Sequence, residues 1–419
     1  MAKFAVVCEH RGVSSYTFQW LKYMVRAAGL DLVPPEESDI ILVSVCDVMD
    51  LHALLGVKKF GKPIIVGGAD AFNDLLYSLV ADLVNVGEGW EMFDVLGTIG
   101  HLPAQEVIEK LKPYPFIAAR DKPGPVVPST YIDWMRAPVC QVGPNKKMIL
   151  SGRGCHNKCR FCFTSWTTKY QTNPILPSLD RSIMTISNDN STAEELDRRV
   201  WVRSLTTKTY LGMSPRQAKN CNNYRFGIES FSEERRKWFG KPIPNADLGK
   251  IFRISKKLGH TTRFFIIAGI DPMESVNEFL SMFPPDLDQQ PPVIVKATYF
   301  DPALHTPLAG YDMRTMYHWD TEELVGLLRD KSHRFRLKMA HDRGLAMYRT
   351  SLHRCLTEEE VMTVAKWKGK KYNVIVDLIE SRGWTHLFDQ APPTKIQFDW
   401  RKGAVRVPMK RIAFPGASS

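Results

Sequence analysis

The sequence predicts an α/β protein with an N-terminal Rossmann-like parallel-sheet domain, a partial (β/α)6 barrel and a small α+β C-terminal extension. Three observations support this prediction. Short runs of Val, Ile and Leu alternate with helix-like stretches over residues 1–100, a second series of the same kind starts at residue 146, and the pattern changes again after residue 312. Apolar strands separated by helices are typical of parallel sheets covered on both faces.

The first series predicts a Rossmann-like domain over residues 1–100, followed by a connector. Its elements are strands at 3–9, 39–45, 62–68 and 82–89, with helices at 16–29, 50–61 and 71–80. Residues 101–145 are rich in proline and show little periodicity, which is typical of a connector.

The second series predicts a barrel over residues 146–312. Its strands are expected at 147–152, 182–189, 199–205, 224–230, 261–271 and 292–300, with helices that include 233–240 and 245–259. Six strands of this kind make a partial barrel. In parallel β/α folds the chemistry lies at the carboxyl ends of the strands, so we expect the functional residues there.

The composition indicates an ordinary globular protein. The chain has 419 residues, of which 44% are hydrophobic and 24% charged. No apolar run reaches the roughly 18 residues that a membrane-spanning helix needs, so we expect a cytoplasmic protein that does not contact the membrane. Eight cysteines are too few for a disulfide framework in a chain of this length, so a tight cysteine cluster favours metal binding or catalysis.

Three cysteines, Cys155, Cys159 and Cys162, directly follow the first predicted barrel strand. Three thiolates can hold three irons of a [4Fe–4S] cluster and leave the fourth iron open to a small chelating molecule. Zinc is the alternative, but no fourth ligand lies at a zinc-like interval, and His156 is too close to Cys155 in sequence to bind the same ion.

The spacing of these cysteines, with Phe161 before the last one, matches the Cys-x3-Cys-x-aromatic-Cys motif, and here the chain resembles the radical S-adenosylmethionine (SAM) superfamily. Three later segments resemble the fourth, fifth and sixth strand regions of the branch that includes methylthiotransferases and enzymes with cobalamin-binding domains. They are "RFGIESFSEERRKWFGKPIPNADL" (225–248), "FFIIAGIDPMES" (264–275) and "YFDPALHTPLAG" (299–310). The N-terminal strands, with Gly67–Gly68 and Gly87–Glu88–Gly89, resemble the cobalamin-binding-like domain of that branch.

The resemblance implies reductive cleavage of SAM at the cluster to give a 5′-deoxyadenosyl radical, with electrons from a donor such as flavodoxin or ferredoxin. It also implies SAM contacts: the backbone beside Phe161 for adenine, and Glu229 and Ser230 for polar parts of SAM. At the end of the second strand, Asp189 with Asn188 or Asn190 would hold the methionyl amine. The alternative for these polar residues is ordinary turn chemistry, which also favours Asn, Asp and Ser at strand ends.

The sequence leaves cobalamin open as a cofactor. The Asp-x-His-x2-Gly cobalamin signature is absent, and His52 in "DLHALLG" (50–56) lies on a later helix, so we interpret it as a helix-face histidine rather than a cobalt ligand. Methylthiotransferases carry a second cluster on three N-terminal cysteines. Here only Cys8 and Cys46 stand at such strand ends, which disfavours that activity.

The last quarter of the chain is basic. From Arg329 to the end there are 19 Lys and Arg against 9 Asp and Glu, an excess of 10 in a chain whose net charge is +11. Residues 313–419 predict an extension with helices at 357–367 and 370–383 and a hairpin at 395–408, which resembles a winged helix. Trp367, Trp384 and Trp400 interleave with the basic residues, as on surfaces that stack bases, although such aromatics also pack in cores. This charge indicates a phosphate-bearing partner or, alternatively, a solvated face.

Two functions follow from these features. The first is a radical SAM enzyme, an isomerase or a transferase, that modifies or rearranges a base in nucleic acid, DNA rather than RNA, or a modified nucleotide. The chain looks broadly like phage proteins that rebuild side chains on thymine, and such a protein would work in the host cytoplasm. The second is a cobalamin-dependent methylase of a small molecule or peptide. A purely structural cluster is disfavoured by the barrel pattern around the cysteines.

Overall fold

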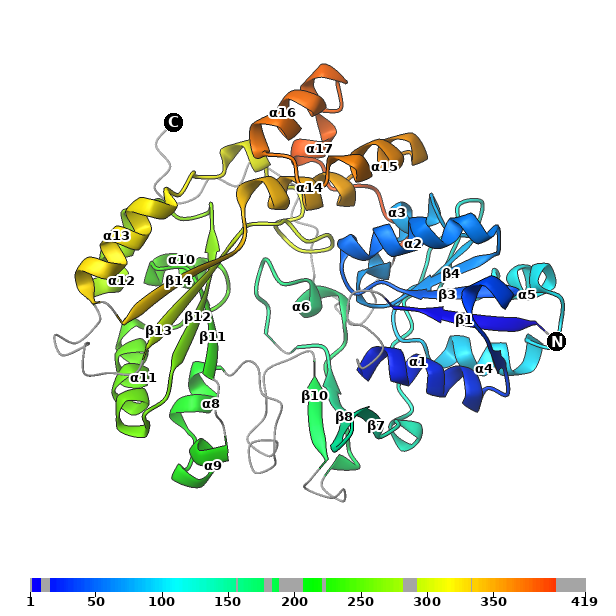
Figure 1. The fold of residues 1–419 in the computed structure, drawn as a ribbon, viewed down its shortest axis with the longest axis horizontal. Helices are drawn as coiled ribbons and strands as arrows, with labels where there is room; N and C mark the ends of the chain where they lie inside the picture. Colours follow the sequence, from blue (N-terminus) through cyan, green and yellow to red (C-terminus); the bar gives the residue numbers. More distant parts are fainter. Residues whose placement is uncertain are drawn as a thin grey trace.

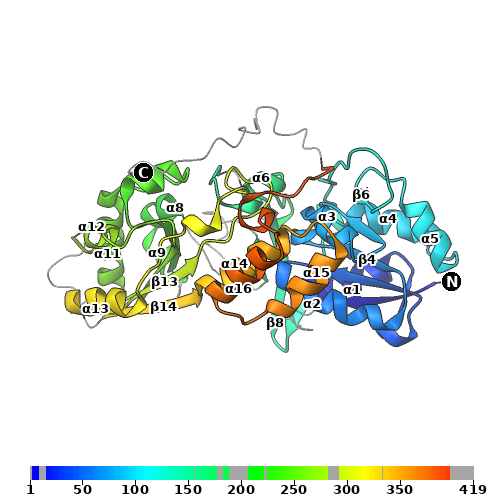
Figure 2. The same cartoon turned by 90° about the horizontal axis from the view of Figure 1, so that it is seen from above.

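The computed structural model describes residues 2–8, 16–155, 157–176, 183–187, 206–220, 224–281, 292–332 and 334–396. Figure 1 shows the N-terminal sheet in blue, the β11–β14 sheet in green to yellow and the smaller β7–β8–β10 sheet between them, with helices α14 to α17 above. Seen from above, these helices lie across the middle of an elongated molecule (Figure 2). The predicted α/β architecture is confirmed.

The N-terminal sheet has six strands in the order β2-β1-β3-β4-β5-β6, and all of its pairings are parallel except that of β6 with β5. Its strands are β1 (Lys3–Val7), β2 (Asp31–Leu32), β3 (Ile40–Ser44), β4 (Ile64–Gly67), β5 (Leu83–Asn85) and β6 (Ile117–Ala118). Every residue of β3 is buried, as expected for a central strand covered on both sides.

Helices cover both faces of this sheet (Figure 1). They are α1 (Tyr16–Ala27), α2 (Leu51–Val57), α3 (Asp74–Ser78), α4 (Trp90–Ile99) and α5 (Ala104–Leu111). The two faces belong to separate cores: Leu54 and Leu76 pack in the core shared with the barrel, whereas Val25 and Phe93 pack in the other. The helices at 16–29, 50–61 and 71–80 are therefore present, and all three are shorter than expected.

Residues 101–145 form more regular structure than the expected connector. Helix α5 packs beside α4, and β6 closes the edge of the first sheet. The prolines made the sequence of this region resemble a connector. They stand between the regular elements, at positions such as Pro103 and Pro115, and not within them.

The barrel strands form two groups. In the first, β10 (Met184–Ser187) pairs parallel with β8 (Lys146–Arg153), and β8 pairs antiparallel with β7 (Cys140–Gly143) and β9 (Gln171–Thr172). The second is a parallel sheet of β11 (Tyr224–Glu229), β12 (Thr262–Ala268), β13 (Val293–Tyr299) and β14 (Phe335–His341). The strand expected at 199–205 lies outside the described residues.

Helices of the barrel region cover one face of the β11–β14 sheet. They include α10 (Glu233–Trp238), α11 (Asn245–Leu258), α12 (Ser275–Ser281) and α13 (Thr321–Lys331), with α6 (Phe163–Thr167), α8 (Thr207–Leu211) and α9 (Pro215–Asn220) elsewhere in this region. The helices expected at 233–240 and 245–259 are confirmed as α10 and α11.

Strand β14 corrects the expected start of the C-terminal extension at residue 313. Because β14 pairs with β13 along its length, the sheet continues to His341, and a separate helical region starts only after it. This region holds α14 (Arg343–His353), α15 (Glu358–Val364), α16 (Tyr372–Ser381) and α17 (His386–Asp389). Helices α15 and α16 confirm the two expected there. The hairpin at 395–408 lies outside the described residues except for its first two, of which Ile396 bridges to Val126. Trp367 and Trp384 pack against each other in the core, and Trp400 lies outside the described residues.

Within the part of the chain that is described, no helix combines the length and the apolar character needed to cross a lipid bilayer.

Gly87 fixes the turn after β5, and its replacement should destabilise the fold. Its φ is +94°, and a Cβ there would lie 2.2 Å from the Ser129 carbonyl oxygen. We expect Gly87→Ala to lower the free energy of unfolding by about 3 kcal/mol, because both backbone strain and a backbone clash oppose the methyl group.

Gly61→Ala is the matched control for this substitution. Gly61 has a φ of +60° but open space around its Cα, so only strain of about 1 kcal/mol applies. Thermal melts of both variants give the comparison, and equal losses would contradict the clash at Gly87.

Candidate active site

The three cysteines lie in a loop that starts at the carboxyl end of β8. The chain turns at Gly154, whose φ is +72° and where a Cβ would lie 2.5 Å from the Lys169 carbonyl oxygen. Cys155 and Cys159 are 8% and 5% exposed, and Cys162 is half-buried. The loop therefore presents its thiols toward the protein interior, as expected from their position after the first barrel strand.

Hydrogen bonds hold the cysteine loop in place. The Cys162 amide and the Trp166 indole both donate to the Cys159 carbonyl, at 3.1 and 2.7 Å. The Arg160 amide donates to the Phe239 carbonyl at 2.9 Å, so the turn after α10 packs directly on the loop. The Asn157 side-chain amide donates to the Cys155 sulfur at 3.4 Å.

A partly buried ion pair lies beside the loop. Lys241 Nζ donates to Glu229 Oε1 at 2.7 Å, and a Cβ at Gly227 would collide with both side-chain ends. Burial raises the pKa of the Cys159 thiol to about 11, against the opposing effect of the Lys241 charge. Burial also disfavours the Lys241 ammonium, but Glu229 and the Cys159 thiolate outweigh it and raise the pKa of Lys241.

Glu229 reaches this position through an irregular strand end. Its φ is +66°, unusual for a residue other than glycine, and the register of β11 with β12 shifts between Gly227 and Glu229. Such bulges redirect side chains, often next to active sites.

The other predicted SAM residues have different surroundings. Phe161 lies on the wall of the cavity described below, with its ring edge-on to Phe239 at 5.7 Å between centroids. Ser230 is buried, and its hydroxyl bonds within its own turn, to the backbone of Ser232. Asn188, Asp189 and Asn190 lie outside the described residues, so their role with SAM stays a prediction.

Among the described residues, no group of three His, Cys, Asp or Glu side chains is placed to hold a single metal ion. A [4Fe–4S] cluster does not require such convergence, because each thiolate binds a different iron. The buried thiols, the donor to the Cys155 sulfur and the cationic Lys241 are chemically suited to an anionic iron–sulfur cluster.

A cavity of about 650 Å³ separates the cysteine loop from the N-terminal sheet. The carboxyl ends of β3, β4 and β5 form one wall through Ser44, Gly67 and Asn85, and Phe161 and Phe163 of the cysteine loop form another. A cavity of this size accommodates a molecule as large as a nucleoside or a drug.

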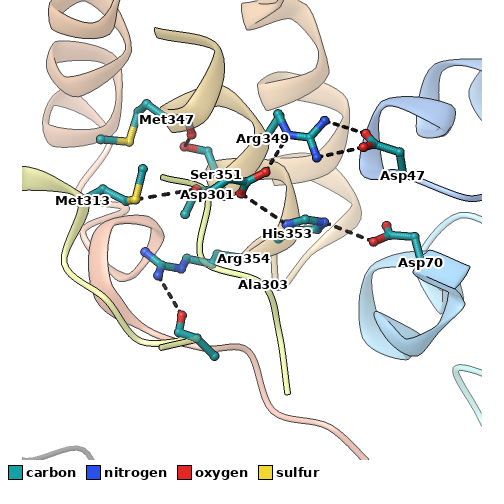
Figure 3. Close-up of polar contacts among 12 residues, drawn as sticks. Asp47, Asp70, Asp301, Ala303, Met313, Met347, Arg349, Ser351, His353 and Arg354 are labelled. Carbon is teal, nitrogen blue, oxygen red and sulfur yellow. Dashed lines mark hydrogen bonds and ion pairs between the residues drawn. The ribbon is translucent and has the colours of Figure 1, made fainter. Parts of the chain in front are cut away.

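Five charged side chains gather at this cavity (Figure 3). Arg349 donates to both carboxylate oxygens of Asp47, at 2.6 and 2.9 Å, and to Asp301 at 2.5 Å. His353 lies 3.4 Å from Asp70 and 3.9 Å from Asp301. Although burial opposes its charge, these carboxylates raise the pKa of His353, and Arg349 lowers the pKa of Asp47.

The sequence reasoning missed this charged cluster. Asp47 and Asp301 lie within three residues after the ends of β3 and β13, and Asp70 follows the Gly67–Gly68 turn after β4. The rule that ligand-binding residues stand at the carboxyl ends of parallel strands would have selected all three. Arg349, within α14, and His353, the last residue of α14, carried no such signal.

Other residues noted in the sequence have structural partners. Glu88 accepts from Arg153 at 2.8 Å and so joins the N-terminal domain to β8. Gly68 and Gly87 leave space for the backbone of Val45 and Ser129. His52 lies 2.8 Å from the Tyr348 hydroxyl, on a helix and not on the cavity wall, as expected for a helix-face histidine. Cys8 is buried, and Cys46 lines the cavity.

No protein-family model matches the chain, and no curated protein sequence matches it. Solved structures that resemble it include the cobalamin-dependent S-adenosylmethionine radical enzyme OxsB with aqua-cobalamin bound. That structure has a TM-score of 0.46 and 14% identity, over 67% of this chain and 52% of that one. OxsB with aqua-cobalamin and S-adenosylmethionine bound has a TM-score of 0.47 and 12% identity, over 95% of this chain and 58% of that one. This chain therefore spans between half and three fifths of the length of those structures.

Asp271, buried after β12, should make stability depend on pH. Burial raises its pKa to about 6, although Arg235 and the Phe231 amide favour the charged form. The folded carboxyl thus binds its proton more tightly than the unfolded one, whose pKa is 3.8. The Asp271 carboxyl therefore stabilises the fold fully at a pH below its pKa in the unfolded chain. This stabilisation is lost as the pH rises through its pKa in the folded protein.

Asp271→Asn removes this titration and nearly preserves the shape of the side chain. Between about pH 4 and pH 7, the free energy of unfolding of the unsubstituted protein should fall relative to that of the variant by about 2 kcal/mol. Chemical denaturation at both pH values measures it, and parallel pH curves would contradict the assigned pKa.

Proposed function

We propose that this protein is a radical SAM enzyme that holds a [4Fe–4S] cluster on Cys155, Cys159 and Cys162. The observation that supports it most is the buried three-cysteine loop at the carboxyl end of β8, whose Phe161 faces a cavity shared by both sheets. When bound there, the cluster and SAM would supply a radical able to remove hydrogen from an unactivated carbon. Reduction would come from an external electron donor such as flavodoxin or ferredoxin.

The residues of the chain position and shield this chemistry. Lys241 offsets negative charge at Cys159 and Cys162, and Glu229 holds Lys241 in place. We also assign Glu229 to the polar part of SAM, as the sequence resemblance implies, and its charge acts on the nearby Cys159. Phe161 and Phe163 place apolar rings on the cavity wall, which limits access of water to a reactive intermediate.

The proposed substrate is a base in nucleic acid, such as a hypermodified thymine in DNA. Asp47, Asp70, Asp301 and Glu88 line the cavity, and their carboxylates can accept hydrogen bonds from the N–H groups of a base or of an amine attached to it. The basic C-terminal quarter supplies charge for the phosphates. A base in a duplex would have to flip out to enter such a cavity.

The alternative is a cobalamin-dependent methylase of a small molecule or peptide. It is supported by the position of the cavity, which lies at the carboxyl edge of the N-terminal sheet, where a cofactor between the sheet and the cysteine loop would be accommodated. A nucleic-acid substrate needs phosphate contacts, whereas this alternative needs none.

Cys159→Ala should abolish formation of 5′-deoxyadenosine from SAM under reducing conditions, because one iron of the cluster would lose its thiolate. Iron and sulfide content after anaerobic reconstitution, about four of each in the unsubstituted protein, should fall in parallel. Cys140→Ala is the matched control, since Cys140 is also buried but lies in β7, outside the loop. Turnover by Cys159→Ala at the rate of this control would refute the proposal.

Neutralising the basic residues near the C-terminus tests whether the substrate is nucleic acid. Arg401, Lys402, Arg406, Lys410 and Arg411 lie outside the described residues, so their role follows from sequence alone. If they contact phosphates, binding to a DNA duplex should weaken steeply with salt, and each neutralised contact should lower the log–log slope by about 0.9. Affinities at two salt concentrations, for the intact and the neutralised tail, measure this. Negligible binding at low salt would favour the methylase.

A further inference from the structure

The β11–β14 sheet has one apolar face and one basic face. Residues of β12 and β13 alternate between buried and half-buried, and the buried set packs on helices such as α11 and α12 (Figure 1). The opposite set carries the positive charge. We define the basic face as Arg225, Arg263, Lys296, Arg336 and Lys338.

The strand register places these cations next to one another. Arg225 of β11 is the register partner of Arg263 of β12, and Lys296 of β13 is the register partner of Lys338 of β14. Like charges directly opposite on neighbouring strands destabilise a sheet. Two such pairs on one face therefore indicate a requirement other than stability.

The space above this face suits an anion. A second cavity, of about 610 Å³, extends from this face to α13 at the β14 edge of the sheet. All five residues of the basic face and Arg329 line it together with apolar residues such as Ile294 and Leu328, and no acidic side chain among the described residues lines it. The Nε atom of Arg225 is buried without a hydrogen-bond acceptor among the described residues, so a donor is available there. Burial and the charge of Arg225 both lower the pKa of Arg263. A bound anion would offset the repulsion between these two guanidinium groups.

We propose that the basic face binds the phosphates of a single nucleic-acid strand, an inference that rests on the function proposed above and names a second contact surface for its substrate. Phe265 lies among the cations, with Lys296 Nζ 5.5 Å from its ring centroid. A positively charged groove with an aromatic side chain is typical of surfaces that bind single-stranded nucleic acid.

The basic face is close enough to the first cavity to serve it. Lys296 lies five residues before Asp301 along β13, a separation of roughly 16 Å in an extended chain. A strand held here by its phosphates could place a base a few nucleotides away beside the cysteine loop.

The test is the binding of oligo(dT) of about 15 nucleotides at several salt concentrations. On single-stranded DNA, each lost phosphate contact lowers the slope of log affinity against log salt concentration by about 0.7. For the Lys296→Gln/Lys338→Gln double variant we therefore expect the slope to fall by about 1.4 and the affinity at 0.1 M salt to fall roughly 25-fold. This variant removes a like-charge pair, so its melting temperature should not fall below that of the unsubstituted protein. Lys250→Gln/Lys257→Gln, on the exposed side of α11, is the control for the same change in net charge.

Each outcome separates the hypotheses. An unchanged slope in the Lys296/Lys338 variant, or an equal loss in the control, would overturn the assignment of this face. Thymidine monophosphate is the second ligand to measure. If it binds as tightly as the oligonucleotide and loses the same affinity in the variant, the face binds a single nucleotide and the proposal of a nucleic-acid strand is refuted. Formation of 5′-deoxyadenosine by the unsubstituted protein without nucleic acid tests the cluster chemistry independently, so its failure would refute the proposed function and not this surface.

Discussion

The contact of Arg349 with Asp47 and Asp301 determines how the two halves of the molecule meet. Arg349 lies on α14, Asp47 follows β3 of the N-terminal sheet, and Asp301 follows β13 of the barrel region. These three side chains are 13–24% exposed, so the loss of one partner would leave a partly desolvated charge without its counter-ion. The triad therefore favours an arrangement in which the carboxyl ends of β3 and β13 both face α14, beside the large cavity. Figure 3 shows the guanidinium group between the two carboxylates.

Further contacts close the walls of this cavity. Arg153 and Glu88 tie the start of the cysteine loop to the N-terminal domain, and the His305 ring lies 2.6 Å from the Phe72 carbonyl oxygen on the other side. Because these contacts come from different elements, the position of the cysteine loop depends on the whole assembly and not on β8 alone. This explains why the first sheet shares one of its two cores with the barrel.

Much of the fold was predictable from local pattern, and the site was predictable only in part. The buried strands β1, β3, β4 and β8 read clearly, because continuous apolar runs leave little ambiguity. Strand β14 was missed because its alternate residues Arg336 and Lys338 are charged and exposed, so the segment lacks the apolar run of a buried strand. The Arg349–Asp47 contact spans 302 positions, and no local pattern reports a pairing of that range.

The opposite charges of the two cavities suggest how a nucleic-acid substrate would be oriented. Four carboxylates line the cavity at the cysteine loop, beside Arg349, His353 and Arg153. The second cavity, at the basic face of the β11–β14 sheet, is lined by apolar residues and by cations, and no acidic side chain among the described residues lines it. A phosphate is repelled from the first and attracted to the second, and a neutral base with N–H donors has the reverse preference. The sugar–phosphate backbone would therefore stay on the sheet while only the base enters the carboxylate-lined cavity. Positioning by phosphates and selection by contacts to the base are separate tasks in nucleic-acid recognition. In this fold the basic face of the β11–β14 sheet would position the phosphates, and the cavity at the carboxyl edge of the N-terminal sheet would select the base.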